Sequence, residues 1–310
     1  MKIMIAYDGS VYADAALDDL RKAGLPRDAE ALIVSVSDGL VSASAPIAEI
    51  AGSAHASRRV TSVIEVARDQ AVQLVEEARR FAGLARGRLV SYFPEWEVRT
   101  QVLEGSPSSE LLRKAELWQP DLIIVGSQGR SALGRFFLGS VSKALATQSS
   151  SSVRVARHTA DREQDLPPRL IIGVDGSTEA LAAVRAVGCR VWPEGTQIKI
   201  ITVDESMSSG NTLQIALPSG TITVNNEATG KALQMAEWAA DQFRAIGLNV
   251  SVMMAKGKAQ NILLDEAIKW EADSIFVGAH GLDHRDERSG LGAVSDSLIA
   301  NASCSVEVGR

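Results

Sequence analysis

The chain contains two copies of one sequence unit, and this repeat limits the possible folds more than any other feature. The opening segment MKIMIAYDGS returns as LIIGVDGS, which places Asp8 and Asp175 167 residues apart. Farther along the offset is 152 residues, so that Trp118 matches Trp270, and near the end it is 153 residues. A unit that occurs twice predicts two similar domains rather than a solenoid of many repeats.

The two copies meet at a charged segment that ends in two prolines, a composition typical of an exposed linker. We therefore expect a first domain over residues 1–157, a linker over 158–168 and a second domain over 169–310. The second copy is shorter by 15 residues, which are lost between its second and third expected strands.

Short apolar runs alternate with longer segments of helical periodicity in both copies. The expected strands are 2–7, 31–37, 97–103, 122–125, 153–157, 170–174, 197–203, 249–255, 274–277 and 305–308. The expected helices are 11–20, 57–86, 107–118, 139–148, 178–187, 227–246, 260–269 and 294–301. This alternation predicts an α/β fold with a parallel sheet covered on both faces. In such folds ligands bind at the carboxyl ends of the strands.

Composition excludes several classes of partner. There are 38 acidic and 32 basic residues, a net charge of -6, whereas a duplex-binding protein normally has a basic surplus, so we expect no nucleic acid partner. No apolar run approaches the roughly 18–20 residues that span a bilayer, and the first apolar run is too short for a signal peptide. The 2 cysteines cannot form a disulfide framework. We expect a cytoplasmic protein without a membrane contact.

One segment of the second copy, between its second and third expected strands, is interpreted as a β-hairpin. Residues 212–217 and 221–224 alternate apolar and polar side chains around a Pro-Ser-Gly turn. The matching part of the first copy is rich in alanine and serine and lacks this pattern. The arm could cover a site or contact a second chain; the alternative is an ordinary loop.

The motif with the clearest chemistry follows the fourth expected strand of the first copy. It reads GSQG at residues 126–129, then nine residues, then GSVS at 139–142, where a helix is expected to begin. Glycines let the backbone approach an anion and adopt positive φ, and the free N–H groups of a helix start favour negative charge. Ser140 and Ser142 would add hydroxyl donors. The alternative is that the glycines only make a tight turn and that Ser140 only caps the helix.

Gly126, Gly129, Gly139 and Ser140 have the spacing G-2x-G-9x-G-S, and Asp8 is followed by Gly-Ser. In these features the chain resembles the universal stress protein family over nearly its whole length, as a tandem of two domains. The resemblance implies two open five-stranded parallel sheets of order 3-2-1-4-5, with two helices on each face. It also implies an ATP-binding stress-response or signalling module, with the nucleotide over the carboxyl ends of strands 1 and 4.

The resemblance further implies a set of binding residues. Asp8 and the backbone of Ala6 and Tyr7 would meet adenine and ribose, and Val36 would touch the adenine. The residues around ribose and phosphates would be Gly126, Gln128, Gly129, Arg130, Gly139, Ser140, Val141 and Ser142. Arg130 is included on chemical grounds, as a cation beside a triphosphate, and the alternative is a surface arginine. For Asp8 the alternative is a turn residue ahead of a helix. The ligand would be ATP, ADP or AMP, and a triphosphate could carry Mg²⁺.

The second copy keeps this pattern only in part. Its corresponding residues are Asp175, Val203, Gly278, His280, Gly281, Gly292 and Ser295. Ten residues, three of them acidic, separate the two halves of its motif, and Ala293 stands where the first copy has Ser140. A hydroxyl lost from a charged phosphate costs about 1.5–3 kcal/mol, or about 10- to 100-fold in affinity. We therefore expect the first domain to hold the nucleotide better. His280 belongs to no metal-binding pattern and is interpreted as a phosphate-loop or surface residue.

Two other functions stay open at this point. A slow Mg²⁺-dependent ATPase is conceivable, although the chain has no P-loop motif and no residue stands out as catalytic. A scaffold that binds no ligand and acts through dimerisation is the third reading. The resemblance implies association through the last strand, so the expected last strands, 152–157 and 305–308, could pair edge to edge within one chain, hide two exposed edges and make it a pseudo-dimer. The family resemblance also implies a homodimer of whole chains.

Overall fold

The computed structural model describes residues 1–37, 58–129, 138–157, 166–205, 213–217, 220–224, 227–281 and 290–310, with 58–67, 213–217 and 220–224 described by their backbone only. The elements of the first half are β1 (Lys2–Ala6), α1 (Val11–Asp19), the 3₁₀ helix η1 (Leu20–Lys22), β2 (Glu30–Ser37), α3 (Arg58–Tyr92), β3 (Glu97–Glu104), α4 (Pro107–Trp118), β4 (Leu122–Gly126), α5 (Ser140–Gln148) and β5 (Ser152–Ala156). Those of the second half are β6 (Arg169–Gly173), α6 (Thr178–Gly188), β7 (Gln197–Asp204), β8 (Leu213–Leu217), β9 (Gly220–Val224), α7 (Glu227–Ala245), β10 (Asn249–Lys256), α8 (Ala259–Lys269), β11 (Ser274–Gly278), α9 (Ala293–Asn301) and β12 (Ser305–Gly309).

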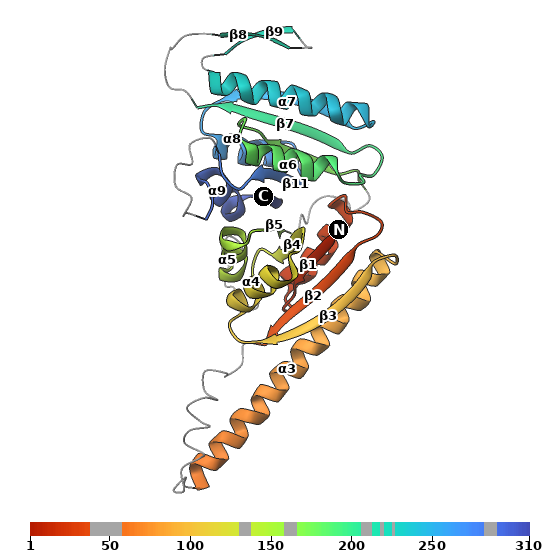
Figure 1. Ribbon diagram of the computed structural model, residues 1–310, viewed down its shortest axis with the longest axis vertical. Coiled ribbons are helices and arrows are strands. Elements are labelled where there is room, and N and C mark those ends of the chain that lie inside the picture. The colour runs from red at the N-terminus through yellow and green to blue at the C-terminus, as the bar shows by residue number, and fades with distance from the viewer. Residues whose placement is uncertain are drawn as a thin grey trace.

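Both halves contribute to one continuous sheet (Figure 1). Its ten strands have the order β10-β7-β6-β11-β12-β5-β4-β1-β2-β3. Each half therefore has the expected order 3-2-1-4-5, and its strands are parallel. The halves join where β12 pairs antiparallel with β5. The expected fold class is confirmed, and so is the edge-to-edge pairing of the two last strands; the two sheets form one because of that pairing.

The helices cover the two faces of this sheet in pairs. On one face, α4, α5, α8 and α9 pack on an apolar cluster that continues across the junction of the halves. On the other face, α1 and α3 cover the first half and α6 and α7 the second, over two separate apolar clusters. Fully buried isoleucine, leucine and valine side chains dominate all three clusters, and each contributes roughly 1.5–3 kcal/mol to stability. Among the described residues, apolar packing therefore continues from one half to the other on the α4 and α5 face of the sheet. On the α1 and α6 face it is interrupted between the halves.

Serine caps begin the first helix of each half, as the sequence predicts for Ser10. The Ser10 hydroxyl accepts a hydrogen bond from the Ala13 N–H at 3.1 Å. Ser177 does the same for the Ala180 N–H at 3.0 Å. Because these caps hold α1 and α6 directly after β1 and β6, the turns that contain Asp8 and Asp175 have matching shapes.

The segment between β7 and α7 contains a β-hairpin, as predicted. β8 and β9 pair antiparallel as a separate two-stranded sheet, which lies beside α7 at one end of the molecule (Figure 1). At the opposite end, α3 extends past the sheet; it ends at Tyr92, six residues later than the helix expected from the sequence.

Candidate functional site

The two parts of the GSQG and GSVS motif lie against each other at the carboxyl end of β4. The Gly139 N–H donates to the Ser127 carbonyl at 2.8 Å. The Ser142 hydroxyl donates to the Gly126 carbonyl at 2.6 Å and is buried. These two bonds hold the start of α5 beside the turn that follows β4. The loop between them, residues 130–137, lies outside the described residues, so the expectation for Arg130 is not addressed.

Among the described residues, no side chain caps the amino terminus of α5. Its N-cap is Gly139, which offers no side-chain hydrogen bond to the first turn, whereas α1 is capped by Ser10. The first N–H groups of a helix have no intrahelical partner, and the helix dipole makes them attractive to an anion. Ser140 is exposed at this point and can add a hydroxyl donor. This arrangement is suited to a phosphate or carboxylate group.

Ser142 does not add a second donor. Its hydroxyl proton is already committed to the Gly126 carbonyl, and only 2% of the residue is exposed. Ser295 repeats the arrangement in the second half, with its hydroxyl donating to the Gly278 carbonyl at 2.6 Å. Both serines therefore fasten a helix to a strand end, a role that differs from the phosphate contact expected for them.

The glycines of the motif serve close packing rather than positive φ. Positive φ occurs in the described residues at Gly9 and Gly176, next to Asp8 and Asp175, but at no motif glycine. A Cβ on Gly126 would lie 2.6 Å from the Tyr12 carbonyl oxygen in α1. The expectation of positive φ was wrong, because this position is glycine to let α1 approach β4.

Gly278 repeats this packing in the second half. A Cβ there would lie 2.5 Å from the backbone carbon of Glu179 in α6. At these two positions close packing of a helix on the strand end is sufficient to explain the glycine without a ligand, a reason that differs from the tight-turn alternative.

Asp8 connects the end of β1 with the motif. One oxygen of its carboxylate accepts from the Ser10 N–H at 3.0 Å. The other faces Gly129, where a Cβ would lie 3.0 Å from it. Asp175 and Gly281 are related in the same way in the second half, with a corresponding distance of 2.6 Å. The structure therefore brings the expected acidic residue and the second motif glycine together in both halves.

Ala6, Val36 and Val141 supply an apolar surface beside the motif, all on the face covered by α4 and α5. Val203 has the matching position on β7 in the second half.

The backbone of Tyr7 is occupied within the protein. Its N–H donates to the Val34 carbonyl at 3.0 Å, and its carbonyl accepts from the Ser35 hydroxyl at 2.7 Å. The Tyr7 side chain turns to the opposite face, where its hydroxyl donates to Asp14 at 2.6 Å. Burial first, and then this hydrogen bond, raise the pKa of Tyr7. The contact expected between the Tyr7 backbone and adenine or ribose would thus compete with existing bonds to β2.

The second half builds the same framework with fewer donors. Gly292 caps α9 without a side-chain bond, and its N–H donates to the Ala279 carbonyl at 2.9 Å. The next residue is Ala293, so the exposed hydroxyl of the first half is missing. His280 lies next to Gly292: a Cβ added to Gly292 would be 3.4 Å from the His280 Cα. The acidic loop 282–289 is outside the described residues.

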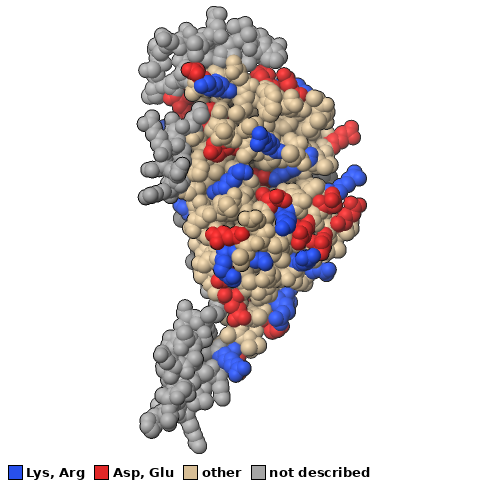
Figure 2. Space-filling view, in the orientation of Figure 1, with Lys and Arg blue, Asp and Glu red and all other residues tan. Residues whose placement is uncertain are grey.

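The face of the molecule shown in Figure 2 carries charges of both signs. Acidic and basic side chains are interleaved on this face. The described residues contain no group of three or more His, Cys, Asp and Glu side chains that could hold a metal ion. None of the described helices combines the length and the hydropathy needed to cross a membrane.

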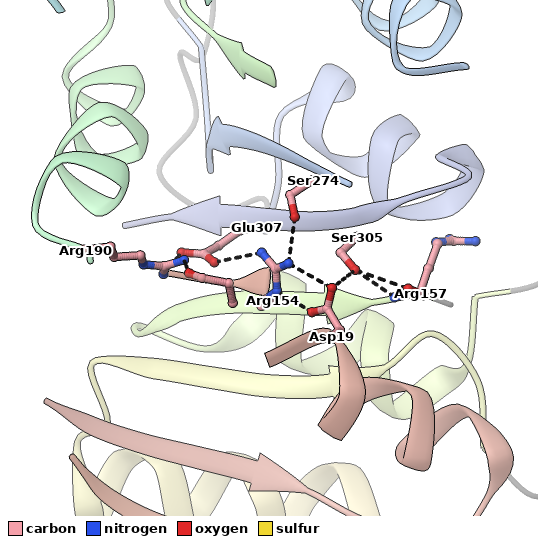
Figure 3. Close-up of polar contacts among 8 residues, drawn as sticks. Asp19, Arg154, Arg157, Arg190, Ser274, Ser305 and Glu307 are labelled. Atoms are coloured by element: carbon pink, nitrogen blue, oxygen red, sulfur yellow. Dashed lines mark hydrogen bonds and ion pairs between the residues drawn. The ribbon is translucent and has the colours of Figure 1, made fainter. Parts of the chain in front are cut away.

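One group of buried charges went unpredicted (Figure 3). Arg154 of β5 bonds Asp19 of α1 at 2.6 Å and lies 3.4 Å from Glu307 of β12. Glu307 in turn pairs with Arg190, which follows α6. The signal that could have found them is a charged residue between two valines in each last strand, at matching positions and with opposite sign. We call Asp19, Arg154, Glu307 and Arg190 the seam charges.

Comparison with known proteins identifies the family. A sequence model of the universal stress protein family matches residues 1–157 and 168–310. A universal stress protein of Mycolicibacterium smegmatis is 25% identical over 310 residues, which cover 99% of this chain and 96% of that protein. The crystal structure of a universal stress protein from Archaeoglobus fulgidus has a TM-score of 0.65 at 20% identity and covers 100% of this chain and 98% of its own.

A universal stress protein family protein from Arabidopsis thaliana, solved with AMP bound, has a TM-score of 0.31 at 16% identity and covers 46% of this chain and 90% of its own. A TM-score this low does not decide the family. The family model does, because its two matches together span nearly the whole chain. The chain belongs to the universal stress protein family.

Proposed function

We propose that this chain is an ATP-binding signalling module that holds the nucleotide mainly in its first half. The observation that supports this most is the amino terminus of α5, which has no side-chain cap and is fastened beside the turn after β4, where Gly129 lies next to Asp8. The AMP-bound relative is too distant in fold to transfer its ligand by likeness, so the support comes from the family and from this geometry.

The chemical groups of the site match the parts of a nucleotide. The α5 N–H groups and the Ser140 hydroxyl would donate to phosphate oxygens. The Asp8 carboxylate is an acceptor and would bind ribose hydroxyls rather than phosphates. Val36 and Ala6 would pack against the base. Mg²⁺, if bound, would be held chiefly by the triphosphate, since the described residues gather no ligand set for a metal.

The difference in expected ATP affinity between the two halves follows from one hydroxyl group and one acidic loop. Ser140 is exposed and donates to no described group, whereas Ala293 has no donor at all. A hydrogen bond to a charged phosphate is worth about 1.5–3 kcal/mol, which corresponds to about 10- to 100-fold in affinity. The acids of loop 282–289 would repel a triphosphate and widen this difference.

A reciprocal exchange at this position tests the proposal. Ser140→Ala should weaken the tighter ATP site about 10- to 100-fold, and Ala293→Ser should strengthen the weaker one. Both positions are exposed at a helix start, so neither change should alter stability much. ATP titrations by calorimetry, with native mass spectrometry to count bound nucleotides, measure both effects.

Gly129→Asp and Gly281→Asp provide the matched pair that assigns the sites to the halves. Each places a second carboxylate beside an existing one, Asp8 or Asp175. Gly129→Asp should remove the tightly bound nucleotide and Gly281→Asp should leave it. The proposal is wrong if only Gly281→Asp empties the protein. A protein that carries no nucleotide at any ATP concentration would favour the scaffold, and ADP formed in proportion to protein concentration would favour an ATPase.

A further inference from the structure

The antiparallel pairing of β5 with β12 has a local two-fold axis. Arg154 lies opposite Glu307, and Val153 and Val155 lie opposite Val308 and Val306. The two copies are offset by 153 residues here, so Arg154 and Glu307 occupy the same position in the repeat. A residue on the axis of such a pair faces its own equivalent, whereas every other residue faces a different position. A difference between the halves at this position therefore decides which edges can pair.

The contacts on both sides of the axis are symmetric. The Arg157 N–H donates to the Ser305 hydroxyl at 3.0 Å, and its equivalent, the Arg310 N–H, donates to the Ser152 hydroxyl at 3.2 Å. Each of these arginines also reaches the last turn of the other half's helix, α9 for Arg157 and α5 for Arg310. These flanking contacts would be the same if two first halves, or two second halves, paired with each other.

The symmetry breaks on the axis, as it also does beside it, where Lys22 of the first half pairs with Asp273 of the second half at 3.1 Å. Arg154 donates to Asp19 through Nε at 2.6 Å and Nη2 at 2.9 Å, and lies 3.4 Å from Glu307, which pairs with Arg190 (Figure 3). The four side chains are at most 8% exposed. Their signs alternate along the row, negative, positive, negative, positive, and each half contributes one of each. In this order every buried charge has an opposite charge as its neighbour.

Pairing of like halves would destroy that order. Two first halves would place Arg154 against Arg154, and two second halves would place Glu307 against Glu307. Each charge would keep the partner of its own half, but it would face a buried like charge across the axis in place of an opposite one. A buried charge that faces a like charge is strongly destabilised. We propose that the seam charges make each edge selective: β5 accepts an edge with an acid on the axis and rejects a second β5. The partner that fits β5 is a second half, either of the same chain or of a second copy. Because β5 and β12 already pair within one chain, two complete chains would have to associate through other surfaces.

The first test uses the whole protein with a protease site placed in 158–165. After cleavage the two halves stay together, and native mass spectrometry counts mixed and like pairs once exchange has reached equilibrium. Mixed pairs should exceed like pairs at least tenfold, which corresponds to ~1.4 kcal/mol. Like pairs at their statistical share would overturn the proposal.

A variant without the seam charges is the control. It carries Asp19→Ala and Arg190→Ala, the residues that the other copy has at these positions, with Arg154→Met and Glu307→Met on the axis. Replacement of a complete buried ion group by apolar side chains is often tolerated, so this variant should fold. Once cleaved, it should form like pairs in amounts near the statistical share. If it stays as selective as the parent, selectivity does not come from these charges and the proposal falls.

A comparison in the uncleaved chain separates charge sign from loss of a bond. Glu307→Gln keeps the shape and removes the charge, whereas Glu307→Arg places two positive side chains on the axis. Glu307→Arg should therefore lower the melting temperature more than Glu307→Gln does, or fail to fold where Gln folds. Equal losses for the two variants would show that the sign on the axis does not matter and would count against the proposal.

Discussion

Cys304 predicts how the stability of this protein falls in alkaline solution. The residue lies between α9 and β12 in the apolar cluster that spans both halves, and it is 1% exposed. Burial, acting first, raises the pKa of its thiol from 9.0 to about 12. Below pH 9 the thiol is neutral in both the folded and the unfolded chain, so its contribution to stability is complete. Between pH 9 and 12 only the unfolded chain loses the proton, and stability falls as the pH rises.

The size of the effect follows from these two values. At pH 10, ionisation of a thiol of pKa 9.0 in the unfolded chain lowers the free energy of unfolding by about 1.4 kcal/mol relative to pH 7. The folded thiol is still neutral at pH 10, so nothing offsets this loss. Urea unfolding at pH 7 and pH 10 measures it. Other groups also titrate in this range, and a matched variant is needed to isolate the thiol.

Cys304→Ala is that variant, and Cys189→Ala is its control. Cys304→Ala should reduce the loss between pH 7 and pH 10 by about 1.4 kcal/mol, whatever its own effect at pH 7. Cys189 is exposed and meets water in both states, so Cys189→Ala should keep the full loss. If Cys304→Ala and the parent lose the same stability within about 0.5 kcal/mol, the thiol is not held neutral by the fold and the reasoning fails.

Two further predictions concern the seam and the candidate site. Arg154→Met should lower the free energy of unfolding by about 3–5 kcal/mol because it leaves the buried carboxylate of Asp19 without its arginine. Adding Asp19→Ala should restore part of that loss, as measured by urea unfolding. If the double variant loses as much stability as the two single variants together, this prediction is wrong. Ser142→Ala should cost about 1–2 kcal/mol through the lost bond to the Gly126 carbonyl, with little change in ATP affinity. An ATP affinity reduced as much as by Ser140→Ala would show that Ser142 touches the ligand after all.

The repeat and the periodicity were sufficient to predict the α/β fold class. Apolar runs of strand length and helices with one apolar stripe are local patterns, and they predicted the alternation of strands and helices in each copy. The strand order and the pairing of the last strands were implied by the family resemblance and not by these patterns. The hairpin was also predictable, because alternation around a Pro-Ser-Gly turn is a local signal. The end of α3 was missed by six residues, although Ala82, Ala85 and Leu89 continue its apolar stripe onto the sheet.

The candidate site was predictable in outline but not in the role of each residue. The family resemblance implied that Asp8 and Gly129 belong to one site, and the structure places them side by side. The resemblance could not reveal that Gly126 is required by the α1 backbone, or that the Ser142 hydroxyl is used internally. Such roles depend on three-dimensional proximity between segments that a motif treats separately. The seam charges depend on it further, since Arg154 meets its partner from a strand 153 positions later.

The antiparallel contact at the centre of the sheet has one more consequence. Because β5 and β12 run in opposite directions, the carboxyl ends of β1 and β4 point away from those of β6 and β11. The two candidate sites therefore lie at opposite ends of the strands of a single sheet, and they are separate from each other. Two different macromolecules could bind at the two sites of one chain at the same time without touching each other. Any coupling between the sites would have to pass through the four central strands, β11, β12, β5 and β4.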